Sequence, residues 1–162
     1  AFIMPSADGI KKGATVSIYG KSVTGTWEGY TPTTTYFWKA TPGGNSNVGG
    51  LVGTGNLGFG DLGQIWSGPG DNNYLTTPSA VNLRKYNKLI VRINKTAGRD
   101  YGGVNIIALY SKGGNRSLAT WRTDSAVGEE FSLEYDASLM ATLKLRFTYE
   151  GTGLWIWKLE NS

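Results

Sequence analysis

The chain has 162 residues, a length typical of a single domain that buries its own hydrophobic core. Apolar residues make up 40% of the sequence, which excludes a disordered chain, and charged residues make up only 17%, below the usual proportion of about 25%. Cysteine and histidine are both absent. Their absence excludes disulfide bonds, thiolate zinc sites, thiol catalysis and acid–base chemistry by an imidazole.

The net charge of +4 comes entirely from the second half of the chain. Residues 1–80 hold four basic and four acidic side chains, whereas residues 81–162 hold 12 basic and eight acidic ones. The basic residues are scattered in runs of at most two, whereas a nucleic-acid-binding surface usually clusters them. No apolar run approaches the length of about 20 residues that a membrane span needs. We therefore expect no binding of nucleic acid and no membrane insertion.

The first half of the chain combines two predicted strands with a long glycine-rich segment. Alternation of apolar and polar residues over 14–20 (ATVSIYG) predicts a strand, and the threonines and aromatic residues of 34–40 predict another. Residues 43–70 contain 11 glycines, a density that excludes a helix. We expect loops there, with short extended pieces such as residues 63–67.

The second half shows a more regular pattern. Residues 142–149 (TLKLRFTY) give its clearest alternation, with Leu143, Leu145, Phe147 and Tyr149 predicted inward and Lys144, Arg146 and Thr148 outward. The same reasoning predicts five further strands, at residues 88–94, 104–110, 117–122, 130–135 and 153–159. The only helical feature expected is a turn near Asp136–Met140.

Short strands separated by turns every 8–12 residues predict a sandwich or a barrel. No exact repeat and no linker rich in proline and serine divides the sequence. We therefore predict one all-β domain spanning residues 1–162, with residues 43–70 as its glycine-rich loops.

Two stretches of the second half resemble a known family. Residues 71–93 contain the phrase YNKLIVRI after a loop with an Asn-Leu pair, and residues 130–159 contain the phrase LKLRFTYEGTG before a final strand. Together they resemble the jelly-roll (galactose-binding-like) carbohydrate-binding modules of bacterial polysaccharide-degrading systems. The resemblance covers residues 71–159. It implies a two-sheet antiparallel β-sandwich of jelly-roll type, which binds a polysaccharide or oligosaccharide without catalysis.

The resemblance also implies where such a protein works and what accompanies it. We expect a secreted or cell-surface protein, with a catalytic domain as a partner in a larger parent protein. Many such modules hold a structural calcium ion with an acidic residue of the last strand, but here that stretch reads Trp155-Ile156-Trp157-Lys158. We expect no cofactor, with a structural calcium ion left as the open alternative.

Candidate binding residues come first from the tryptophans. Six Trp and nine Tyr exceed what a core of this size requires, so some should be exposed. Flat, stiff aromatic faces suit the C–H groups of a sugar ring. We predict ligand contacts from Trp38, which follows Phe37 in a strand, from Trp66 in the glycine-rich segment, and from Trp121 near a strand end.

Polar side chains on predicted strand faces complete the candidate site. Arg92, Asn105 and Arg146 occupy outward positions, with Lys144 beside them. On a solvated sheet face such residues need no function. If their strands are neighbours, however, they form a polar floor for a glycan, and one that could favour acidic sugars.

Other functions remain open alternatives. A receptor-binding domain of a virion or phage and a purely structural sandwich would share this fold. A small glycanase would need two carboxylates beside a cleft, for which Glu28, Asp61 and Asp71 are available, whereas Glu129 and Glu130 should point to opposite faces of a strand. A polysaccharide lyase using tyrosine or lysine is also open. No motif supports either enzyme, so we predict no catalytic residue.

Overall fold

A computed structural model describes residues 6–7, 10, 12–26, 32–135 and 140–162. It divides the chain into two compact units, Ala1–Pro32 and Thr33–Ser162, which are described separately below. The single-domain boundary of 1–162 stays a prediction. The expected turn near Asp136–Met140 lies almost wholly outside the described residues. Among the residues described, no helix is long and apolar enough to cross a membrane.

The first unit is built around a β-hairpin. Strands β1 (Thr15–Ile18) and β2 (Lys21–Thr24) pair antiparallel. Tyr19 and Gly20 connect them, and both have positive φ angles, of 50° and 76°. Positive φ at both central residues is the mark of a type I′ turn, whose twist matches that of paired strands.

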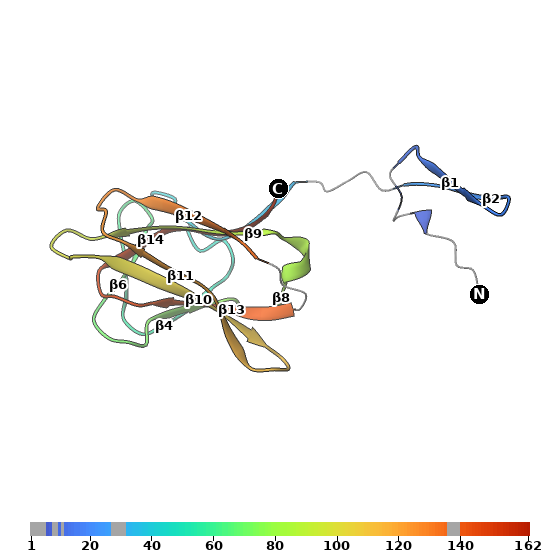
Figure 1. The fold of residues 1–162 in the computed structure, drawn as a ribbon. Coiled ribbons are helices and arrows are strands. Elements are labelled where there is room, and N and C mark those ends of the chain that lie inside the picture. The colour runs from blue at the N-terminus through green and yellow to red at the C-terminus, as the bar shows by residue number, and fades with distance from the viewer. Residues whose placement is uncertain (1–5, 8–9, 11, 27–31, 136–139) are drawn as a thin grey trace. The chain divides into compact units, whose positions relative to one another are not determined.

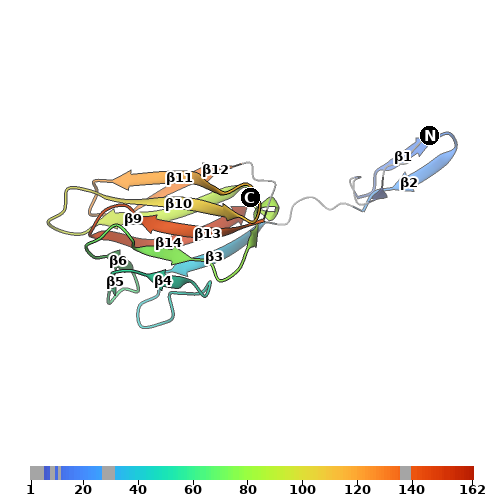
Figure 2. The ribbon, with the colours of Figure 1, turned by 90° about the horizontal axis from the view of Figure 1, so that it is seen from below.

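The second unit is a sandwich of two antiparallel sheets, each of six strands. The first sheet runs in the order β11 (Asn115–Thr123), β10 (Gly102–Tyr110), β13 (Met140–Phe147), β7 (Tyr74–Thr76) and β4 (Val52–Thr54), and β8 (Val81–Asn82) also pairs with β13. The second sheet runs β12 (Glu129–Glu134), β9 (Lys88–Lys95), β14 (Thr152–Asn161), β6 (Ile65–Ser67) and β5 (Leu57–Phe59), and β3 (Thr33–Lys39) also pairs with β14. Figures 1 and 2 show the two sheets stacked face to face. The predicted all-β sandwich is confirmed.

The core lies between the sheets and is built mainly by alternation along their central strands. On β13, Leu143, Leu145 and Phe147 are buried, and on β9 of the facing sheet Leu89 and Val91 are fully buried. The 3₁₀ helix η2 (Leu83–Lys85), which Asn82 caps, leads into β9. Because one face of each central strand is committed to this core, its alternate residues must face outward.

Strand β3 departs from alternation at two successive residues, Phe37 and Trp38, which are both buried. Tyr36 pairs with Lys158 of β14 and Trp38 pairs with Trp157, so Phe37 is an extra residue in the ladder. Such an irregularity bends the strand and lets two neighbouring side chains turn to one side. The ring of Phe37 then packs against that of Trp157, with centroids 4.9 Å apart.

Candidate functional site

The outward side chains of the first sheet meet in a row that crosses five of its strands. From β11 to β4 the register pairs Thr120 with Asn105, Asn105 with Arg146, Arg146 with Tyr74, and Tyr74 with Thr54. Residues directly opposite each other in a ladder lie on the same side of the sheet. We call this outward surface the polar face; Lys144 and Arg122 also belong to it.

Asn105 stands at the centre of the polar face with its amide held in place. Its Nδ2 lies 2.7 Å from Oγ of Ser117, 2.7 Å from Oγ1 of Thr120 and 3.0 Å from the carbonyl oxygen of Ala119, all acceptors on β11. The two N–H groups of the amide are therefore used on that side. Its Oδ1 has no partner among the described residues and remains as a half-buried acceptor on the face.

Two cations of β13 lie on the same face, two residues apart. Nε of Arg146 donates to the carbonyl oxygen of Asp71 at 3.3 Å, which holds the guanidinium in place and leaves its terminal nitrogens for a ligand. Nζ of Lys144 lies 3.9 Å from the ring centroid of Tyr74. A cation over a tyrosine ring is attracted by the ring's π electrons, which orients both side chains.

An aromatic cluster stands at one end of the polar face. The guanidinium of Arg122 lies 3.8 Å from the ring centroid of Tyr101. That ring meets the ring of Tyr149 edge-on at 4.4 Å, and Tyr149 is 38% exposed. Tyr149 was predicted to face inward with Phe147, but β13 ends at Phe147, and the chain then turns before β14. The alternation therefore does not extend to Tyr149.

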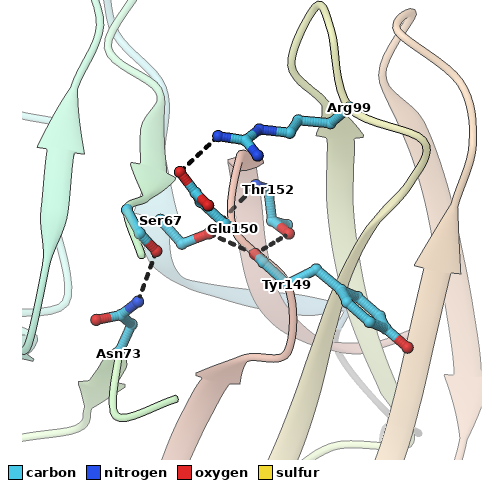
Figure 3. Close-up of polar contacts among 7 residues, drawn as sticks. Ser67, Asn73, Arg99, Tyr149, Glu150 and Thr152 are labelled. Carbon is cyan, nitrogen blue, oxygen red and sulfur yellow. Dashed lines mark hydrogen bonds and ion pairs between the residues drawn. The ribbon is translucent and has the colours of Figure 1, made fainter. Parts of the chain in front are cut away.

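Buried hydrogen bonds fix the main chain that carries Tyr149. Its carbonyl oxygen accepts from Oγ of Ser67 at 2.6 Å and from Oγ1 of Thr152 at 2.8 Å, and the Thr152 nitrogen donates to the same Ser67 oxygen at 3.2 Å. Arg99, in the loop between β9 and β10, forms an ion pair at 2.5 Å with Glu150 of the same turn. Figure 3 shows this network, with the Tyr149 ring pointing away from it. The exposed ring thus stands on a rigid turn.

Two predicted site residues lie instead on the outer face of the second sheet. The register aligns Gly58, Trp66, Gly153 and Asn94 across β5, β6, β14 and β9. A Cβ atom on Gly58 would lie 2.2 Å from Nε1 of Trp66, so only glycine lets the indole lie flat there. Trp66 is 38% exposed, as its prediction requires.

Arg92 lies close to this row. Its guanidinium stacks 5.7 Å from the ring centroid of Trp155, whose Nε1 donates to Oδ1 of Asn94 at 3.0 Å. We call this surface, with Trp66, the tryptophan face. The sandwich core separates the tryptophan face from the polar face, so Arg92 and Arg146 do not share the floor that the sequence suggested.

The predicted exposure of Trp121 and Trp38 is wrong. Trp121 pairs with Val104 of β10 and points into the core, where 7% of it is exposed. Trp38 is 2% exposed because the bulge in β3 turns it inward and Phe59 stacks on it at 6.1 Å. Neither indole presents a face on which a sugar could stack.

A hollow of about 620 Å³ lies among the glycine-rich loops above Trp38. Phe59 forms part of its wall and is 70% exposed. Most polar groups around it are already used: Asn47 exchanges hydrogen bonds with the main chain of Leu51, and Oγ of Ser46 accepts from the Thr41 nitrogen. The hollow therefore offers fewer polar groups to a ligand than the polar face does.

The expectation of no cofactor, with a structural calcium ion as the open alternative, stays a prediction. Calcium takes six to eight oxygen ligands, mostly carboxylates and carbonyls. No three acidic side chains cluster together in the described part of the chain. In the last strand, Glu160 is held by Lys158 at 2.9 Å. In the loop before β7, Oδ1 of Asn73 accepts from the Asn56 nitrogen at 2.6 Å, so this side chain fastens the loop.

Comparisons with solved structures show which class of fold this is. A variant of a family 29 carbohydrate-binding module superposes with a TM-score of 0.56 at 17% identity, over 82% of this chain and 94% of that one. A family 29 module from Piromyces equi gives 0.54 at 13% identity, over 82% and 92%. A variant complexed with mannohexaose gives 0.55 at 14% identity, over 82% and 94%.

At such identities the likeness shows the fold alone. The chain has the jelly-roll β-sandwich fold of these carbohydrate-binding modules, which confirms the fold that the resemblance implied. No protein-family model and no curated protein sequence matches the chain.

The sequence reasoning missed most of the aromatic part of the polar face. Tyr74 lies on β7, a strand of three residues that is too short to show a period. Tyr101 lies just outside β10, and its role depends on Arg122 and Tyr149, which are far from it in the sequence. Alternation did identify Lys144 and Arg146, because β13 is long and one of its faces is fully buried.

Proposed function

We propose that this protein binds carbohydrate without catalysis, and that the polar face is its principal binding surface. The observation that supports this most directly is the row from Thr120 to Thr54, which crosses five strands of a carbohydrate-binding-module fold. At its centre it presents a fixed amide and a fixed guanidinium beside the ring of Tyr74. Planar polar groups for hydroxyls next to aromatic rings are what a sugar-binding surface needs.

The charges of this surface support a non-catalytic role. Glycoside hydrolysis needs two carboxylates flanking the bond, and the six strands of the first sheet contain no Asp or Glu. On β12 of the other sheet, Oε2 of Glu129 accepts from Oγ1 of Thr123 at 2.6 Å, and Glu130 follows it on the opposite side of the strand. Glu28, the third carboxylate weighed for a glycanase with Asp61 and Asp71, lies outside the described residues.

Affinity electrophoresis through gels containing single polysaccharides tests the function, with an assay for reducing ends alongside. We expect retardation in at least one gel, without release of reducing sugar. Tyr74→Ala should remove most of that retardation, since losing an aromatic anchor costs about tenfold or more in affinity. Tyr19→Ala, which removes an exposed tyrosine of the first unit, is the matched control.

The possible results separate the alternatives. Release of reducing ends would mean a glycanase. No retardation in a broad panel would favour a structural sandwich or a domain that binds a protein receptor. If Tyr74→Ala leaves the retardation intact, the binding site lies outside the polar face.

We also propose that Trp66 and Arg92, with Trp155, contact a second glycan chain on the tryptophan face. The support is the exposed indole of Trp66 in line with the hydrogen-bonded pair of Asn94 and Trp155. Trp66→Ala should then lower the affinity for an insoluble polysaccharide, which engages both faces, by about tenfold, and leave the affinity for a short oligosaccharide at the polar face unchanged. An equal loss of affinity for both ligands would place Trp66 in the principal site. No loss of affinity for either ligand would mean that Trp66 only shields the outer surface of the sheet from solvent.

A protein that binds extracellular polysaccharide is expected to lie outside the cell and to work with an enzyme. We propose that the chain acts outside the cell, joined to or working beside a catalytic domain that degrades the bound glycan. The fold of its structural neighbours supports this. Immunoblotting of the culture medium and of washed cells checks it, and protein confined to the cell lysate would contradict it.

A further inference from the structure

The two sheets of the sandwich differ sharply in charge. The six strands of the first sheet contain four basic residues and no acidic one. The six strands of the second contain five basic and four acidic residues. The surplus positive charge of the strands is therefore concentrated on the sheet that carries the polar face.

Three of these four cations, Arg122, Lys144 and Arg146, belong to the polar face itself. Lys144 and Arg146 are alternate residues of β13, which puts their Cα atoms about 7 Å apart. Arg122 stands two strands away, about 10 Å across the sheet. None of the three forms an ion pair within the described part of the chain.

The contacts that these cations do make orient them without neutralising them. Lys144 and Arg122 each lie over a tyrosine ring, and Arg146 donates its Nε to a main-chain oxygen. The two terminal nitrogens of Arg146 stay available as a planar pair of donors, the geometry that matches a carboxylate. Like charges held this close repel one another, and an anionic ligand relieves that repulsion.

We propose that the ligand of the polar face is an acidic polysaccharide, a chain of uronic acid or similarly anionic sugars, which lies across β11, β10, β13 and β7. This rests on the carbohydrate-binding function proposed above and names its substrate class. Arg146 pairs with one sugar carboxylate, while Lys144 and Arg122 attract its neighbours along the chain. Asn105 and Tyr74, in line with Arg146, contact the hydroxyls and the ring face of the sugars between them.

The polar face suits an acidic glycan better than a nucleic acid. Three cations are few for a phosphate backbone, which proteins commonly contact at six to ten places. The row from Thr120 to Thr54 also contains a single aromatic ring, that of Tyr74, whereas surfaces that bind single strands stack successive bases on several rings.

Titration calorimetry of the whole chain with three probes tests the proposal: polygalacturonate, the neutral mannohexaose, and single-stranded oligothymidylate. We expect binding of polygalacturonate that weakens steadily as sodium chloride is raised. Arg146→Gln should lower that affinity about tenfold, the scale of one hydrogen bond to a charged group, and should flatten the dependence on salt. Lys39→Gln removes one charge from the second sheet as a matched control, and it should change neither quantity.

Each of the other possible results contradicts a different part of the proposal. Binding of mannohexaose with no binding of polygalacturonate overturns the acidic ligand and leaves carbohydrate binding standing. Polygalacturonate binding that Arg146→Gln and Lys39→Gln weaken equally overturns the polar face as its site. Equal affinity for oligothymidylate would mean that the polar face binds any polyanion and is not specific for a glycan. Binding of neither sugar, in this assay and in the gel panel, overturns the function and its substrate class together.

Discussion

Trp121 and Trp66 both lie on strands, yet their neighbours give them opposite roles. Trp121 points between the sheets and fills part of the core, whereas Trp66 lies on the outer surface above Gly58. Burial of a large aromatic ring stabilises the fold by removing apolar surface from water, and deletion leaves a cavity that the sheets cannot close.

We therefore expect Trp121→Ala to lower the free energy of unfolding by about 3–5 kcal/mol, the usual cost of deleting a buried aromatic side chain. Urea unfolding followed by circular dichroism measures it. Trp66→Ala, the same substitution on the surface, should cost less than half as much. A larger loss for Trp66 than for Trp121 would contradict this assignment of core and surface.

At the level of residues, the sequence predicted the polar positions better than the aromatic ones. Asn105 and Arg146 occupy outward positions in long alternating strands, so their placement follows from the period alone. Trp38 was expected to be exposed because glycines offer no side chains to cover it. The structure shows the reverse effect: a Cβ on Gly49 would lie 2.7 Å from the Cα of Phe37, so glycine lets the loop backbone itself press against the aromatic strand. The pattern of apolar residues in the sequence does not predict such a close approach of the backbone.

Among the elements, the short strands and turns contribute most to the shape of the polar face. Strand β7 supplies Tyr74 and is held between β13 and β4. The turn between β13 and β14 supplies Tyr149, and Ser67 of β6 holds it from the opposite sheet. The long strands β9, β10, β13 and β14 were predicted from alternation, but β7 and β8 were not, because two or three residues carry no period.

The conformation of the turn between β13 and β14 depends on one atom, Oγ of Ser67, and a substitution can test this. Ser67→Ala removes the donor to the Tyr149 carbonyl and the acceptor for the Thr152 nitrogen. Leaving buried polar groups unpaired should cost about 1–3 kcal/mol in thermal or urea unfolding. We also expect weaker glycan binding, because Tyr149 loses its support.

Ser22→Ala is the control for this substitution, since it removes an exposed serine that bonds only across the hairpin to Ser17. It should change stability by less than about 0.5 kcal/mol. If Ser67→Ala were equally mild, the turn would be held by the Arg99–Glu150 ion pair and the strand ladders instead.

For the whole molecule, the question is what residues 33–162 require in order to fold. The hydrophobic core identified in the described chain is drawn entirely from Phe37 to Leu159. Strand β3, which begins at Thr33, pairs with β14 through Asn161, so the sandwich contains its own first and last strands. A two-stranded hairpin such as β1–β2, by contrast, is marginally stable on its own.

We therefore expect a chain of residues 33–162 to fold cooperatively and to keep the urea midpoint and the glycan affinity of the full chain. Its unfolding slope against urea should fall only by the small amount of surface that residues 1–32 bury, since that slope follows the area exposed on unfolding. Equilibrium urea titration of both chains, with calorimetry against the best glycan of the panel, measures all three quantities. A midpoint lowered well beyond the error of the titration would show that the first unit stabilises the sandwich. An affinity lost at unchanged stability would instead show that residues 1–32 contribute to the binding surface.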